Sequence, residues 1–261
     1  MRLRFLGTGT SFGVPVIGCT CATCTSDDPR DKRTRHAALL EGNGRALLID
    51  APPELRIQLL REGVRHIDAV WFTHAHADHV HGIDDLRVFA GRSGEPLAVY
   101  AHPETASLLR RRFDYIFDAA YSPPAGTSRP NLELHEFEAW QPVRIAGFEL
   151  LPIEVPHGDQ RVFGFRAGAL GYITDAKRLD SRAIEALRGV RVLVLNALWR
   201  GNPHPTHFSV EEAVDAARTV GAEQTFLTHL AHRARHADLA ASLPAGISPA
   251  HDGLVVDVPE A

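Results

Sequence analysis

The sequence predicts a layered α/β domain in which helices cover β-sheets. Short apolar runs rich in Val, Ile, Leu and Phe recur with turn signals between them, as is typical of strands. The early runs are joined by hairpin signals and the later ones alternate with helical patterns, which favours sheets flanked by helices. The 261 residues, 44% of them hydrophobic, suffice for a sizeable core. No linker or internal repeat divides them, so a single domain, 1–261, is expected.

Apolar runs locate the predicted strands. These runs are Leu3–Leu6, Ala46–Ile49, Ala69–Thr73, Leu97–Tyr100, Phe148–Val155, Val162–Phe165, Leu170–Thr174, Val192–Leu195 and Phe226–Thr228. Between such runs, Asn43-Gly44 and Ala146-Gly147 suit tight hairpins, and Gly168 to Gly171 suits a third turn.

Helical patterns appear between and after these strands. They cover Pro53–Glu62, Asp84–Phe89, Pro103–Arg112, Ser181–Leu187 and Val210–Val220. The last is preceded by Ser209 with Glu212 three residues on, the pattern of a capping box at a helix N-terminus.

Charge and hydropathy indicate which kinds of partner, nucleic acid or membrane, the protein is expected to bind. The formal net charge of -4 gives no overall attraction to a phosphate backbone, so nucleic acid is not an expected partner. The first residues contain no long apolar region, and no stretch approaches the length of a membrane span. We therefore expect a cytoplasmic protein without a membrane partner. Its oligomeric state stays open, with a homodimer among the alternatives.

The predicted strand Ala69–Thr73 leads directly into His74, His76, Asp78 and His79. Alternation places the first two histidines on one side of an extended chain, and a turn then brings Asp78 and His79 back beside them. Imidazole and carboxylate groups suit zinc, manganese or iron. A surface histidine cluster is the alternative, but four such groups in six residues at a strand end favour two metals sharing one loop.

The three cysteines, Cys19, Cys21 and Cys24, fall within six residues. An odd number at such close spacing does not suit a disulfide framework, whereas C-x-C-x₂-C suits thiolate ligands of zinc. A closed tetrahedral site needs one more ligand, and His232, close after His229, is the expected one. His236 or His251 in that position, or three thiols without metal, are the alternatives.

The H-x-H-x-D-H pattern of residues 74–79 resembles the signature of the metallo-β-lactamase superfamily, an αββα sandwich with metals at one edge. Four further segments match family motifs in order: Leu48-Ile-Asp50, Val155-Pro-His157, Ile173-Thr-Asp175 and Leu227-Thr-His229. The resemblance implies a first metal held by His74, His76 and His157, and a second held by Asp78, His79 and His229. It also implies that Asp175 bridges the two metals and that Asp50 supports the ligands. Two metals about 4 Å apart activate water for hydrolysis, so a hydrolase is expected.

The cysteine cluster together with the T-H-x-x-H segment at His229 resembles one branch of that superfamily, the phosphonate-operon cyclic phosphodiesterases. Members open 5-phosphoribosyl 1,2-cyclic phosphate, which implies a small phosphodiester substrate. They carry two catalytic metals and one structural zinc. The branch also has a general-acid histidine, matched here by His207, with His204 as the alternative. The tail resembles the branch as well, since a final strand is expected after Asp252-Gly253.

Three other functions share features with this sequence. A transfer-RNA 3′-processing nuclease has the same two-metal core, but the negative net charge and the lack of a basic arm disfavour it. A thioester hydrolase of the glyoxalase type does not usually carry the cysteine cluster. A protein resembling pyrroloquinoline-quinone biosynthesis protein B would handle a cofactor without catalysis, although the complete set of expected metal ligands favours an enzyme.

Overall fold

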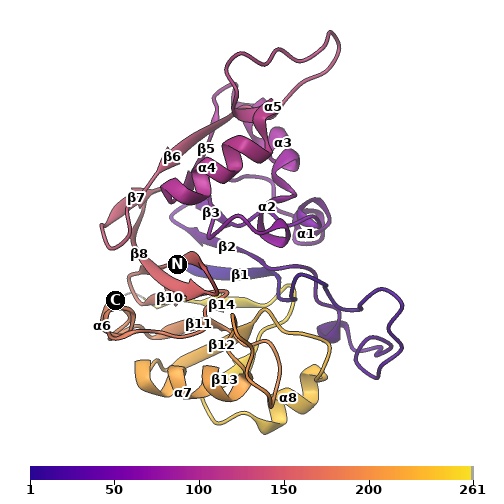
Figure 1. Ribbon diagram of the computed structural model, residues 1–261, viewed down its shortest axis with the longest axis vertical. Helices are drawn as coiled ribbons and strands as arrows, with labels where there is room; N and C mark the ends of the chain where they lie inside the picture. Colours follow the sequence, from indigo (N-terminus) through magenta and orange to yellow (C-terminus); the bar gives the residue numbers. More distant parts are fainter. Residues whose placement is uncertain (260–261) are drawn as a thin grey trace.

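Two seven-stranded sheets pack face to face, with helices on both outer faces (Figure 1). The structure is a computed structural model and describes residues 1–259. Helices α1–α5 cover the first sheet, and helices α6–α8 cover the second on the opposite side of the molecule. The predicted αββα layering is therefore confirmed. Among the described residues, no helix is both long and apolar enough to cross a bilayer.

The first sheet has the order β14-β1-β2-β3-β4-β5-β6, and β3 to β6 run parallel to one another. Its strands are β1 (Arg2–Gly7), β2 (Ala37–Gly42), β3 (Arg45–Ile49), β4 (Ala69–Trp71), β5 (Leu97–Ala101), β6 (Leu132–Glu136) and β14 (Val255–Asp257). As the resemblance implied, the last of these follows Asp252-Gly253 and pairs with β1.

The second sheet has the order β13-β12-β11-β10-β9-β8-β7, and β10 to β13 run parallel. Its strands are β7 (Val143–Ile145), β8 (Phe148–His157), β9 (Gln160–Ala167), β10 (Leu170–Tyr172), β11 (Val192–Asn196), β12 (Gln224–Thr228) and β13 (Ile247–Pro249).

Two groups of helices flank the sheets. The first group is α1 (Leu55–Arg61), α2 (Ala77–Val80), α3 (Arg87–Ser93), α4 (Pro103–Arg112) and α5 (Asp114–Phe117), and the second is α6 (Ser181–Ala186), α7 (Val210–Val220) and α8 (His236–Ser242). Two short 3₁₀ turns cover Pro29–Asp31 and Ile83–Leu86. The capping box of α7 is present: the Ser209 side chain accepts a hydrogen bond from the Glu212 backbone, and the Glu212 side chain accepts one from the Ser209 backbone.

The central core lies between the sheets and contains large aromatic side chains. Trp71 of the first sheet stacks on Phe137 with 4.0 Å between ring centroids, and its indole N–H donates to the carbonyl oxygen of Phe163 on the second sheet at 2.9 Å. A buried indole N–H without a partner would cost free energy. The hydrogen bond therefore favours the packing in which Trp71 of the first sheet faces Phe163 of the second.

Most predicted elements are confirmed, and the differences have physical reasons. The hairpin at Asn43-Gly44 adopts positive φ values of 51° and 72°, as a two-residue turn between antiparallel strands requires. The predicted strand Ala69–Thr73 ends at Trp71, because the backbone N–H of Thr73 turns from the sheet to the side chain of Asp50. Strand β2 was not predicted, because its sequence Ala-Ala-Leu-Leu-Glu-Gly is rich in helix formers and becomes a strand only between β1 and β3.

Candidate functional site

The predicted ligands gather at one edge of the sandwich, where parallel strands of both sheets end. Asp50 follows β3 and the segment 73–79 follows β4, while Asp175 and His229 follow β10 and β12. Carboxyl ends of parallel strands meet along one sheet edge, so residues far apart in sequence come together there. Asp50, Asp175 and His229 have positive φ values of 63°, 52° and 57°. Left-handed backbone at a residue other than glycine costs about 1–3 kcal/mol, a strain that clusters at functional sites.

Two groups of side chains lie close enough to share cations. The ligand nitrogens of His74, His76 and His157 lie within 4.8 Å of one another. In the second group, Oδ2 of Asp78 lies 3.4 Å from Nε2 of His79 and 3.5 Å from Nε2 of His229. Ligands about 2.1 Å from a tetrahedral metal are about 3.4 Å apart, so this spacing fits a cation at the centre of the group.

Asp175 lies between the two groups. Its Oδ2 is 3.4 Å from Nε2 of His79, 3.4 Å from Nε2 of His229 and 3.8 Å from Nε2 of His74. One carboxylate therefore reaches imidazoles from both groups. The resemblance implied a bridge at this residue, and the geometry suits one.

Several ligand atoms are buried without a hydrogen-bond partner. They are Nε2 of His74, Nε2 of His79 and both ring nitrogens of His229. Unpaired polar atoms of this kind are rare in folded proteins because each costs about 1–3 kcal/mol. A divalent cation coordinated by the three Nε2 nitrogens removes that cost for them, so the residues present fit a metal.

A hydrogen-bond chain sets which nitrogen of two histidines carries the proton. Nδ1 of His79 donates to Oδ2 of Asp50 at 2.7 Å, which leaves Nε2 of His79 with a lone pair. The Thr73 hydroxyl donates to the same carboxylate at 2.8 Å, so it accepts from Nδ1 of His74 at 3.0 Å. When the two rings are neutral, both imidazoles thus direct an unprotonated nitrogen into the site, the form that binds metal.

The electrostatics of the site favour one or more positive charges. Burial alone would lower the pKa of His79, but Asp175, Asp78 and Asp50 raise that pKa well above its ordinary value. Burial opposes ionisation of Asp175, yet His229 and His79 hold the pKa of its carboxyl well below its usual range. Carboxylates therefore stay charged where a cation would bind.

The cysteine cluster forms a second, separate group. The Sγ atoms of Cys19, Cys21 and Cys24 lie 3.3, 3.4 and 3.4 Å from Nδ1 of His232. These are the spacings of a tetrahedral zinc with sulfur at about 2.3 Å and nitrogen at about 2.0–2.1 Å. His236 and His251 instead pair with each other, 5.5 Å between ring centroids. Among the alternatives left open by the sequence, the structure thus brings His232 to the thiols.

His207 borders both histidine groups. Its ring lies 4.6 Å from that of His157 and 4.8 Å from that of His229, measured between centroids, and its Nδ1 is buried without a partner. Burial lowers its pKa to about 3. His204 lies one step further out, 5.3 Å from His207 and edge-on to Trp199.

His36, which no sequence pattern indicated, lies fully buried beneath the site. The Tyr172 hydroxyl lies 2.6 Å from its Nε2, and the Thr228 hydroxyl lies 3.2 Å from its Nδ1. Its ring is 5.6 Å from that of His79. A lone histidine before an unpredicted strand gives no local signal, since its partners lie 136 and 192 residues away.

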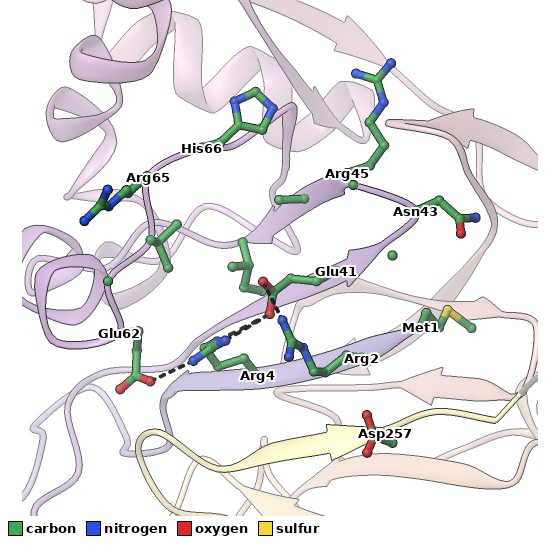
Figure 2. A pocket seen from close by; sticks show the side chains of 16 residues that line it. Met1, Arg2, Arg4, Glu41, Asn43, Arg45, Glu62, Arg65, His66 and Asp257 are labelled. Carbon is green, nitrogen blue, oxygen red and sulfur yellow. Dashed lines mark hydrogen bonds and ion pairs between the residues drawn. The ribbon is translucent and has the colours of Figure 1, made fainter.

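Two surface pockets were compared with the candidate metal ligands, and only one of them lies beside these residues. A pocket of about 360 Å³ opens beside His207 and His229. A larger hollow of about 640 Å³ lies over β1, β2 and β3 (Figure 2), and none of the described residues lining it is a candidate ligand. Its Arg4 pairs with Glu41 and Glu62, each at 3.3 Å, so this cation is already neutralised. The smaller pocket is therefore the better candidate for a substrate.

Comparisons with known proteins agree with this geometry. Residues 45–230 match the model of the beta-lactamase superfamily domain. A solved structure described as a new diphosphatase from the PhnP family is 38% identical, with a TM-score of 0.90 over 99% of this chain and 98% of that one. Zn²⁺-bound PqqB from Methylobacterium extorquens has a TM-score of 0.80 over 99% of this chain and all of that one, but at 20% identity this shows the fold alone.

A curated relative, an octanoyltransferase of Porphyromonas gingivalis, is 37% identical over all of this chain and 52% of its own length. The chain spans about half the length of the curated relatives it matches first. The family model covers most of the chain, and the diphosphatase aligns with it almost end to end. The chain therefore belongs to the beta-lactamase superfamily, with the metallo-β-lactamase fold, and within it to the PhnP family.

Proposed function

We propose that the chain is a metal-dependent phosphoric diester hydrolase that opens small cyclic phosphates such as 5-phosphoribosyl 1,2-cyclic phosphate. The observation that carries this proposal is the position of Asp175, whose Oδ2 lies 3.4 Å from nitrogens of His79 and His229 and 3.8 Å from that of His74. A carboxylate shared by two cation sites suits phosphoryl transfer, in which charge develops on several oxygens at once.

Different side chains would hold the two metals and orient their ligands. Two divalent cations, zinc, manganese or iron, would supply an activated water and neutralise phosphoryl charge when bound. The first would be held by His74, His76 and His157, and the second by Asp78, His79 and His229, with Asp175 common to both. By accepting from Nδ1 of His79, Asp50 orients this ring so that its Nε2 faces the second cation site.

His207 is the proposed donor of the proton to the leaving oxygen. Its buried, unpartnered Nδ1 lies beside the ligands of both cations. Burial lowers the pKa of His207 to about 3, and a negatively charged phosphate beside the ring would raise it. A sugar alkoxide is a poor leaving group and needs that proton, so the donor would act when substrate is present.

Cleavage of a diphosphate is the second candidate. It is favoured by the 38% identity to the protein described as a PhnP-family diphosphatase. Both reactions break a phosphorus–oxygen bond, but a phosphate leaves more readily than an alkoxide and depends less on His207.

Other activities are less well supported. The octanoyltransferase relative is about twice as long as this chain, so its name gives little support for acyl transfer by this chain. The net charge of -4 disfavours a nuclease acting on transfer RNA. The complete set of candidate metal ligands favours an enzyme over a carrier role.

The test is metal-dependent cleavage by manganese-loaded protein of three substrates: 5-phosphoribosyl 1,2-cyclic phosphate, a dinucleoside diphosphate and a precursor transfer RNA. We expect turnover of the first, its loss in Asp78→Asn and its retention in His66→Ala, which alters an exposed histidine paired with Asp68. Preference for the diphosphate would favour the second candidate. Cleavage of RNA alone, or of none of the three, would overturn the proposal.

A further inference from the structure

The imidazole of His207 depends on its surroundings for its orientation. Its Nδ1 is buried without a hydrogen-bond partner among the described residues, and its ring lies beside those of His157 and His229. The segment that carries it, between β11 and α7, forms neither helix nor strand. A proton donor works only when it is directed at the atom that receives the proton. The main chain on either side of His207 must therefore set the direction of the ring.

On its C-terminal side, His207 is joined to the start of α7 by a lysine. Nζ of Lys177 donates to Oε1 of Glu212 at 2.6 Å and lies 3.5 Å from the carbonyl oxygen of His207. The other oxygen of Glu212 accepts from the backbone N–H of Ser209 at 2.8 Å. Lys177 and Glu212 together therefore hold both ends of the short run from His207 to Ser209.

On its N-terminal side, the same segment is tied to a candidate metal ligand. The carbonyl oxygen of Thr206 accepts from Nδ1 of His157 at 3.0 Å. The backbone N–H of Phe208 also donates to the carbonyl oxygen of Ala176 at 2.9 Å. Neither contact uses the side chain of Lys177. Removal of that side chain should therefore change the direction of the imidazole without releasing the segment.

The surroundings of Lys177 favour a role in holding this segment over one in binding substrate. Its side chain is 23% exposed, and that of Glu212 is 34% exposed. Burial raises the pKa of the Glu212 carboxyl, but hydrogen bonds from Lys177 and Ser209 lower that pKa overall, so the carboxylate keeps its charge beside the ammonium. In the described part of the chain, Lys177 is not among the residues that line the pocket beside His207 and His229. The ammonium is therefore directed at Glu212 and away from a phosphate in that pocket.

We propose that Lys177 is a positioning residue for the candidate proton donor: its ammonium holds Glu212 and the carbonyl oxygen of His207, and so directs the imidazole at the leaving oxygen. Lys177 follows Asp175 by two residues, so one short segment would place both the shared carboxylate and the proton donor. The inference rests on the proposed function, in which His207 supplies that proton. A residue that acts only through another loses its effect when the other is removed.

The test measures kcat and KM of manganese-loaded Lys177→Met on 5-phosphoribosyl 1,2-cyclic phosphate and on bis-p-nitrophenyl phosphate. We expect kcat on the cyclic phosphate to fall by roughly 10-fold, less than the ~10²-fold expected for loss of the donor itself, because the contact of Thr206 remains. KM, metal content and the rate on the aryl diester should stay unchanged, since an aryl oxide leaves without a proton. Lys177→Arg should restore most of the rate. In a His207→Ala background, Lys177→Met should cause no further loss.

Arg191→Met is the matched control. Arg191 pairs with Glu223 at 2.8 Å on the surface, immediately before β11 and so at the opposite end of that strand from the site. Its loss removes a comparable ion pair and should leave both rates unchanged. Since exposed ion pairs contribute little to stability, both variants should fold, and their melting temperatures check this.

A second readout does not depend on turnover. In zinc-loaded protein with ¹⁵N-labelled histidines, the ring signals of His207 are those that disappear in His207→Ala. They should shift in Lys177→Met, return in Lys177→Arg and stay in place in Arg191→Met. Unchanged ring signals in Lys177→Met, a raised KM, an equal loss on the two substrates, or a further loss in the His207→Ala background would overturn the inference. If wild type opens no cyclic phosphate but the signals shift as expected, the proposed function fails and the positioning of His207 by Lys177 stands.

Discussion

Nδ1 of His79 lies 2.7 Å from Oδ2 of Asp50, and neither side chain is exposed to solvent. The same carboxylate accepts the backbone N–H and the hydroxyl of Thr73, both at 2.8 Å. Asp50 thus positions a proposed metal ligand and the strand end that carries His74. Because burial raises the pKa of Asp50, the charge of this carboxylate depends on these donors.

Asp50→Asn should weaken metal binding without removing a ligand. An amide accepts less strongly from Nδ1 of His79 and can present an N–H to it, so the imidazole loses basicity and orientation. Partners of metal-bound histidines typically contribute about 10–100-fold in affinity. Calorimetric titration of manganese should show a loss of that size. Unchanged affinity would mean that Asp50 only supports the fold.

The purified protein should carry about three metal ions per chain, two in the histidine site and one in the cysteine site, as the ligand sets imply. Mild chelation should remove activity first and leave one zinc, because thiolates hold zinc more tightly than imidazole and carboxylate hold the paired metals. Elemental analysis after stepwise chelation measures this. Full activity in metal-free protein would contradict it.

Cys21→Ser should release the single zinc and lower the melting temperature while some hydrolytic activity remains, since a structural zinc contributes folding free energy directly. Hydrogen bonds, first that from the Cys24 backbone, lower the pKa of Cys21 to about 6, whereas burial raises the pKa of Cys24 to about 11. A bound zinc would hold both as thiolates.

His232→Ala should lose zinc in the same way, because Nδ1 of His232 lies within 3.4 Å of all three sulfur atoms. His251→Ala is the control and should keep the metal. A Cys21→Ser protein that kept its zinc and melting temperature but lost activity would identify a catalytic thiol instead.

His207→Ala should show an effect that depends on the leaving group. Opening of a ribosyl cyclic phosphate expels an alkoxide and should slow by ~10²-fold or more, the usual scale of general-acid catalysis. An activated p-nitrophenyl diester needs no such proton and should keep most of its rate, with metal content unchanged. His204→Ala should spare both reactions. An equal loss on both substrates would assign His207 to binding.

How far the sequence predicted the site depends on where the signal lies. The candidate ligands from His74 to His79 lie within six residues, as do the three cysteines, so local spacing was enough to predict both clusters. His157, Asp175 and His229 could be identified only by their order in a family pattern, because the folded sheets alone bring strand ends together. His36 was not identified, since its contacts to Tyr172 and Thr228 arise only when the two sheets pack. The pocket beside His207 and His229 likewise joins three separate loops.

The cysteine site also affects how the protein unfolds. Cys24 and His232 are 208 residues apart in the chain, and their loops follow strands of different sheets, β1 and β12. A zinc ion held there would act as a reversible crosslink across the sandwich, and the sheets would separate fully only after a ligand dissociates. The lifetime of the native state would then follow the rate of zinc release more closely than the equilibrium free energy of unfolding. Free zinc in the surroundings would slow unfolding even where the protein is already saturated with its catalytic metals.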